Sequence, residues 1–242
     1  MLFFCYGGGF TTGERQLVPG VVYSGLAAYF ARRGYIVVIP DYRLVPNVTF
    51  PGPAQDVCDA VRWVADVKNA DNLVLNGSPA PDTDRIILTG HSAGGLHITS
   101  MMFDENVLPL DDELRRRIIG LVPNGCPYDL SNPSGLADTV ALYYGNLELA
   151  VENSPANLYR KLPRSAINKL PKILMVQAEN EPDWLRDAGD VFYDTVKEAS
   201  GEALDRKFGK GHNHISITLA LSTGQGEGWA EETCEWLQNL RK

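Results

Sequence analysis

Hydrophobic positions along this chain fall into two alternating patterns. Short, continuously apolar runs predict strands that are buried on both faces of a sheet, and runs with apolar residues three or four positions apart predict helices. We expect strands over 1–6, 35–39, 86–89, 118–122, 173–176 and 204–208. We expect helices over 24–33, 54–67, 96–102, 185–199 and 229–240.

Strands that alternate with helices predict an α/β fold, with a mostly parallel, twisted sheet covered by helices on both faces. The segment 131–168 departs from this alternation, because tyrosines and leucines occur there among scattered prolines. It predicts short helices laid over the sheet. We therefore expect a single domain over 1–242, with 131–168 as a small, helical, cap-like insertion.

Composition narrows the class of protein. With 242 residues, 44% of them hydrophobic, the chain is long enough for one large core. The net charge of −8 argues against nucleic acid or an anionic membrane as a partner. The four cysteines are widely spread without C-x-x-C spacing, which favours buried thiols in a reducing compartment. The apolar start of the chain is too short for a signal peptide or a membrane span, so we expect a cytoplasmic protein.

The stretch Gly90-His91-Ser92-Ala93-Gly94-Gly95 follows a predicted strand and precedes a predicted helix. This is the context of a G-x-S-x-G elbow, in which a strained turn lifts the serine hydroxyl above the sheet. Ser92 is therefore the candidate nucleophile. The triple glycine 7–9 also follows a strand, and its free backbone N–H groups could hold an oxyanion.

An activated serine needs a histidine as base and an acid that orients it. Of the four histidines, His91 and His97 lie in the elbow and in the helix after it, where packing is the simpler explanation. His212 and His214 follow the last predicted strand and remain as alternatives. The H-x-H spacing could also suit a metal, but no second ligand cluster accompanies it, so we expect none.

The acid should follow the strand over 173–176, where Glu179, Glu181 and Asp183 are all available. Their spacing does not identify which of the three acids orients the histidine. The order nucleophile, acid, histidine is the one expected of an elbow-type hydrolase. Because the carboxyl ends of parallel strands meet at one edge, we expect these groups to converge there.

The chain resembles the α/β-hydrolase superfamily over nearly its whole length. Within it, the chain is similar to hormone-sensitive-lipase-like carboxylesterases and to the kynurenine-formamidase-like group. The resemblance rests on five segments: Tyr6-Gly7-Gly8-Gly9-Phe10, Pro40-Asp41-Tyr42-Arg43-Leu44, Gly90-His91-Ser92-Ala93-Gly94-Gly95, Asn153-Ser154-Pro155 and Gly211-His212-Asn213-His214.

By resemblance, Ser92 is the nucleophile, and the backbone amides of Gly8, Gly9 and Ala93 form the oxyanion hole. The family's G-E-x-D-P segment aligns with 178–182 and selects Glu181 as the acid, although the family has aspartate there.

The family's histidine precedes a hydrophobic residue, which matches His214-Ile215. Two further departures stand out. Tyr6 replaces the histidine of H-G-G-G, and the chain begins on the strand that normally follows two earlier ones. The resemblance therefore implies an N-terminally shortened fold.

These features predict a carboxylesterase-type serine hydrolase of small, mostly apolar acyl substrates, with no cofactor. An amidase, formamidase or lactonase would use the same triad, and a non-catalytic binding module or a poorly folding fragment is a further alternative. Tyr143, Tyr144 and Leu147 are expected to roof Ser92 and bind the substrate. Because strand 1–6 lacks its usual outer neighbours, we also expect an open edge that favours a homodimer.

Overall fold

The predicted parallel sheet is confirmed. The structure, a computed structural model, describes residues 1–74 and 80–240. Its six strands lie in the order β2-β1-β3-β4-β5-β6, and every neighbouring pair is parallel. The strands are β1 (Leu2–Cys5), β2 (Val37–Val38), β3 (Ile86–His91), β4 (Ile118–Asn124), β5 (Lys172–Asn180) and β6 (Asp205–Asn213).

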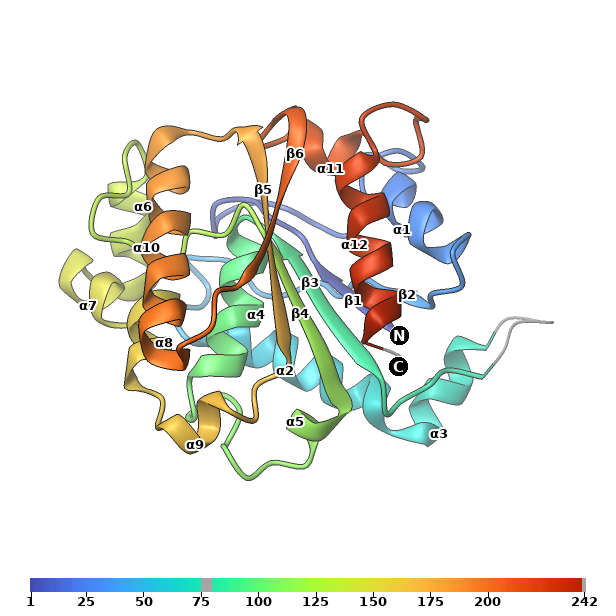
Figure 1. Cartoon of the computed structure of the whole chain (residues 1–242), viewed down its shortest axis with the longest axis horizontal. Helices are drawn as coiled ribbons and strands as arrows, with labels where there is room; N and C mark the ends of the chain where they lie inside the picture. The colour runs from blue at the N-terminus through green and yellow to red at the C-terminus, as the bar shows by residue number, and fades with distance from the viewer. Residues whose placement is uncertain (75–79, 241–242) are drawn as a thin grey trace.

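Helices cover both faces of the sheet (Figure 1). One face carries α1 (Ser24–Ala31) and α12 (Gly228–Asn239), with α11 (Ser216–Leu219) beside them. The other carries α2 (Gly52–Ala65), α4 (Ala93–Phe103), α8 (Pro155–Lys161) and α10 (Asp183–Ser200). The remaining short helices are α3 (Val67–Ala70), η1 (Asp71–Leu73), α5 (Leu114–Arg117), α6 (Ala137–Tyr144), α7 (Leu147–Glu152) and α9 (Arg164–Ile167). In the two described ranges, no helix has the length and apolar character needed to cross a membrane.

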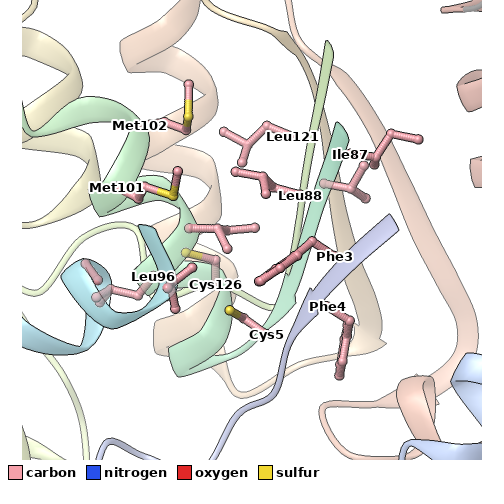
Figure 2. Close-up of a cluster of buried hydrophobic side chains, with 14 of the residues drawn as sticks. Phe3, Phe4, Cys5, Ile87, Leu88, Leu96, Met101, Met102, Leu121 and Cys126 are labelled. Atoms are coloured by element: carbon pink, nitrogen blue, oxygen red, sulfur yellow. The ribbon is translucent and has the colours of Figure 1, made fainter. Parts of the chain in front are cut away.

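The core fills both faces of the sheet, and one part of it lies between the central strands and α4 (Figure 2). Side chains alternate along each strand, so Phe3 and Cys5 point toward α4 while Phe4 points to the opposite face. All eleven residues of α4 are buried. This helix is therefore held on every side, which fixes the residue immediately before it, Ser92.

Three strand predictions need correction in their bounds. The strand expected over 173–176 is the longer β5, Lys172–Asn180. The strand expected over 35–39 is reduced to Val37–Val38, because only these residues pair, with Leu2 and Phe3. This pairing also shows that β1 is not an open edge: it lies between β2 and β3. The argument for a homodimer from an unpaired β1 therefore fails, and the homodimer itself stays a prediction.

The last strand is longer than predicted. The pattern indicated a strand over 204–208, whereas β6 continues to Asn213 alongside β5. The polar residues of its second half hid this continuation, because an edge strand needs no second buried face. The segment 131–168 contains α6, α7, α8 and α9, in line with the short helices expected there.

Candidate active site

Ser92 occupies a strained turn between β3 and α4. Its φ of 54° and ψ of −122° lie outside the ordinary regions for a residue with a side chain. The turn is possible because two glycines let the backbone approach closely. A Cβ on Gly94 would lie 2.2 Å from the carbonyl oxygen of Cys5, and one on Gly90 would lie 2.5 Å from that of Gly94.

The Ser92 hydroxyl is hydrogen-bonded to His214. Oγ lies 2.9 Å from Nε2 of the imidazole, and Nδ1 on the other side of the ring lies 2.7 Å from Oε2 of Glu181. A carboxylate only accepts hydrogen bonds, so Nδ1 carries the proton and donates. Nε2 is then free to accept the serine proton, which is the arrangement that a general base requires.

Glu181 is buried at the carboxyl end of the sheet. Its side chain is fully enclosed, while that of His214 keeps 18% of its surface exposed. Besides His214, the carboxylate accepts a hydrogen bond of 3.2 Å from the backbone N–H of Ala178. A buried carboxylate with these two donors is fixed in place and oriented toward the imidazole.

Gly125 packs closely against Glu181 and His214, a role that the sequence did not predict. The residue follows β4 with φ of +55°, and its N–H donates to the carbonyl oxygen of Val176 at 2.9 Å. A Cβ there would lie 2.8 Å from Oε1 of Glu181 and 2.9 Å from Nδ1 of His214. The only signal in the sequence is a glycine directly after a buried strand.

The other two candidate acids lie elsewhere. Asp183 begins α10, is 87% exposed and forms an ion pair with Arg186. Glu179 accepts a hydrogen bond of 2.7 Å from the N–H of Gly211 and so holds the end of β6. In the part of the chain that the structure describes, neither is hydrogen-bonded to the imidazole of His214, whose side-chain partners are Glu181 and Ser92.

His212 is engaged by a different part of the chain. Its Nδ1 lies 3.1 Å from Oγ of Ser216, and its Nε2 lies 2.7 Å from the carbonyl oxygen of Gly226. The ring is buried, and both of its nitrogens are engaged by these partners. The H-x-H pair is therefore split, with one histidine at the nucleophile and one anchoring a loop. Within 1–74 and 80–240, no group of three or more His, Cys, Asp or Glu side chains could hold a metal ion.

The glycine loop after β1 packs directly against the elbow. A Cβ on Gly7 would lie 2.9 Å from the Cβ of Ser92. The loop then turns through Gly8, whose carbonyl oxygen accepts from the N–H of Thr12 at 3.0 Å. Of the three predicted oxyanion donors, Gly9 and Ala93 line the cavity beside Ser92, and Gly8 does not.

Tyr6 fixes the start of this loop. Its hydroxyl donates to Oδ1 of Asp41 at 3.2 Å, and its carbonyl oxygen accepts from the hydroxyl of Tyr42 at 2.7 Å. The rings of Tyr6 and Tyr42 stack with centroids 4.6 Å apart. The segment 40–44 therefore anchors the glycine loop.

An apolar cavity of about 150 Å³ opens beside Ser92. Apart from the Ser92 and His214 side chains, the lining is hydrocarbon, aromatic or glycine. It consists of Gly9, Phe10, Ser92, Ala93, Pro127, Leu130, Leu136, Val140, Pro182, Trp184, Leu185 and His214. A 150 Å³ apolar cavity in another protein accommodates benzene, so a small aryl or short acyl group matches this volume.

The three residues expected to roof the site do not line this cavity. Tyr143 stacks on Phe10 with centroids 4.4 Å apart, and so lies one layer behind the wall. Tyr144 stacks on Phe50 at 4.7 Å, and Leu147 is 39% exposed. None of Tyr143, Tyr144 and Leu147 therefore lines this cavity, and their role in substrate binding stays a prediction. The same segment instead contributes Leu136 and Val140, because the first turns of α6 approach Ser92 and its last turn packs inward.

Esterases are among the proteins that this chain resembles in sequence and among those that it resembles in structure. A family profile described as BD-FAE matches residues 1–118. The chain is 35% identical over 99 residues to the probable carboxylesterase M8 of Phoma sp., which is 39% of this chain and 29% of that protein. It is 34% identical over 95 residues to arylacetamide deacetylase of Bos taurus, which is 39% of this chain and 22% of that protein. The chain thus spans less than a third of these curated relatives.

Solved structures match nearly the entire chain. An esterase from Rhizomucor miehei superposes with a TM-score of 0.72 at 23% identity, covering 100% of this chain and 73% of that one. Esterase B from Lactobacillus rhamnosis superposes with a TM-score of 0.76 at 18% identity, covering 99% and 76%. At these identities, the likeness establishes the fold.

Proposed function

We propose that this chain is a carboxylesterase-like member of the α/β-hydrolase superfamily, a serine hydrolase of carboxylic esters with small, mostly apolar acyl groups. The observation that carries the proposal is the continuous line of hydrogen bonds from Glu181 through His214 to Ser92, at 2.7 and 2.9 Å, beside an apolar cavity. This line joins residues from three separate strand ends.

In the proposed reaction, Oγ of Ser92 attacks the ester carbonyl carbon while its proton passes to Nε2 of His214. Glu181 holds the imidazole in the required tautomer and stabilises its charged form. The oxyanion accepts hydrogen bonds from the backbone amides of Gly9 and Ala93, with Gly8 as a third candidate donor.

The imidazolium then returns its proton to the leaving alkoxide, and the alcohol departs. Water, deprotonated by His214, attacks the acyl-enzyme and releases the acid, which restores Ser92.

The cavity supports the choice of acyl group. Its lining between Phe10 and Trp184 contains no charged side chain, so a charged acyl group would lose its hydration without gaining a partner. We therefore propose uncharged acyl groups of a few carbons, or a small aryl group, as the part of the substrate that enters the cavity.

Amides of small aryl amines are a second candidate. The similarity to arylacetamide deacetylase favours them, and the same nucleophile and base would act on an amide carbonyl. A matched pair of substrates, p-nitrophenyl acetate and p-nitroacetanilide, separates the two, because they differ only in the atom that leaves.

The test combines p-nitrophenyl butyrate hydrolysis with covalent labelling by a fluorophosphonate. We expect turnover and labelling in the parent protein and neither in Ser92→Ala, with the fold unchanged by circular dichroism. Ser165→Ala, an exposed serine on α9, is the matched control and should behave as the parent. An active Ser92→Ala protein, or a folded parent that neither turns over ester nor takes the label, would refute the serine mechanism.

A further inference from the structure

His91 lies against the proposed base instead of in the hydrophobic core. It fills the variable position of the G-x-S-x-G elbow, and its Nε2 lies 2.7 Å from the main-chain carbonyl oxygen of His214. A carbonyl oxygen only accepts, so His91 donates through Nε2–H. The ring centroids of the two histidines are 4.6 Å apart, with the planes tilted by 37°.

Burial keeps the protonation state of His91 constant. His91 is 4% exposed. This burial, followed by the like charge of the neighbouring His214, lowers the pKa of His91 to about 3. The ring is therefore neutral throughout the pH range of ester hydrolysis, and it cannot itself serve as the base for Ser92.

The far side of the His91 ring is confined as well. A Cβ on Gly7 would lie 3.1 Å from Nδ1 of His91, so the glycine loop closes against the imidazole. His91 thus ends β3 at the elbow, contacts the glycine loop after β1, and donates a hydrogen bond to the loop after β6. It joins the three pieces whose relative position sets the geometry of the attack.

The loop that carries His214 is tied next to that residue as well. Asn213 pairs with Asn180 of β5, and its Oδ1 accepts from the N–H groups of Ile215 and Ser216. These contacts shape the loop, whereas the hydrogen bond from His91 links the carbonyl oxygen of His214 to the elbow itself.

We propose that His91 is a positioning residue, which holds the main chain of His214 so that its imidazole faces Ser92 and Glu181 at once. This inference rests on the proposed serine hydrolase function. His97, one turn further along α4, provides the contrast: it is also buried, but its Nδ1 lies 3.3 Å from the hydroxyl of Tyr143, away from the reacting atoms.

The test compares His91→Leu, which fills the space without a donor, with His91→Gln, whose amide N–H can take the place of Nε2–H. For p-nitrophenyl acetate we expect His91→Leu to lower kcat by roughly ten- to a hundredfold, the range for a misplaced reacting group, with KM nearly unchanged. His91→Gln should recover most of this loss. His97→Leu is the control for removing a buried imidazole and should retain kcat.

A second readout does not depend on turnover. The proton that His214 Nδ1 shares with Glu181 should give a far-downfield NMR signal in the parent and in His91→Gln, and should be lost or broadened in His91→Leu. Should His91→Leu fail to fold, His91→Met replaces it as the donor-free variant.

Parental kcat in a folded donor-free variant, or equal impairment of the Leu and Gln variants at equal thermal stability, overturns the inference while the serine mechanism stands. A parent protein without hydrolysis or labelling overturns the proposed function instead. In that case the NMR signal still decides on His91, because its persistence in His91→Leu would show that the donor does not position His214.

Discussion

The loops at the carboxyl ends of the strands and the segment 131–168 are built under different constraints. At the strand ends, backbone approaches backbone so closely that side chains are excluded, as at Gly94 and Gly125. In 131–168, a Cβ on Gly135 would meet nothing within 4 Å, and Leu142 and Leu149 are exposed. The strand ends carry the proposed reacting groups, and the segment supplies part of the cavity wall. Substitutions in the first should therefore change rates, and those in the second should change preferences.

The largest expected effect is that of His214→Ala. Removing the proposed base should lower kcat by about 10⁴-fold or more, close to the effect of Ser92→Ala, because members of one relay are not additive. His212→Ala removes hydrogen bonds to Ser216 and Gly226. It should lower the free energy of unfolding and leave the kcat of the folded protein nearly intact. Stopped-flow or plate kinetics normalised to the folded fraction will rank the two, and the reverse ranking would transfer the role to His212.

Glu181→Gln is expected next, with a loss in kcat of about 10⁴-fold. The amide would donate to Nδ1 of His214, which places the ring proton on Nε2 and removes the acceptor that Ser92 needs. Asp183→Asn should stay near the parent, since an exposed i,i+3 pair with Arg186 contributes little. Equal, small effects in the two variants would mean that another group orients the histidine.

Much of this site could be predicted from the sequence because it depends on local pattern. The strand, glycines and helix around Ser92 identify the elbow, and the alternation of strands and helices identifies the sheet. The choice between His212 and His214 could not be made from the residues without the resemblance, because both follow β6 and only packing against Gly226 or Ser92 separates them.

Two other features could not be predicted from the sequence, because they depend on contacts between distant segments. The role of Gly125 depends on its approach to Glu181 and His214, which are distant in the sequence. The displacement of Tyr143 from the cavity depends on its stacking against Phe10. Neither long-range contact leaves a periodic signal in the sequence, so the sequence could not predict the residues that line the cavity.

The close backbone packing at the strand ends, compared with the open surroundings of Gly135, can be tested by measuring stability. Gly94→Ala places a methyl group 2.2 Å from the carbonyl oxygen of Cys5 and should lower the free energy of unfolding by about 3 kcal/mol or more. Gly135→Ala meets no neighbour and only forces alanine to a φ of +76°, at a cost of about 1 kcal/mol. Urea unfolding measures both, and equal losses would remove the distinction between the two regions.

Acid should destabilise the fold through His91 at the end of β3 and His97 in α4, because both are held neutral, with pKa values lowered to about 3, mainly by burial. The unfolded chain binds a proton at each near pH 6.5, so stability is full above that pH and falls as the pH drops toward 3. Between pH 7.5 and 5.5 each histidine should contribute a loss of about 1.4 kcal/mol.

His97→Leu should reduce that pH dependence by one histidine's share. Urea unfolding of the parent and the variant at both pH values provides the measurement. An unchanged difference between the two pH values would show that His97 does not remain neutral in the folded protein.

The smallest expected effect, and the one that addresses 131–168 directly, is that of Val140→Ala. Val140 is buried on α6 and lines the cavity, whereas Leu142 on the same helix is 49% exposed. Parent activity on p-nitrophenyl esters should fall for acyl chains beyond about eight carbons, because a cavity of this size cannot enclose them.

Replacing Val140 by alanine makes room for one further methylene of the substrate, which is worth about 0.8 kcal/mol or roughly fourfold in kcat/KM for the longer ester. The optimum should therefore move to longer chains while kcat for the preferred ester stays close to the parent value, and Leu142→Ala should leave the profile unchanged. If the parent rate rises steadily with chain length, or if the two variants share one profile, then α6 does not shape the acyl site and the division between reacting groups and cavity wall is wrong.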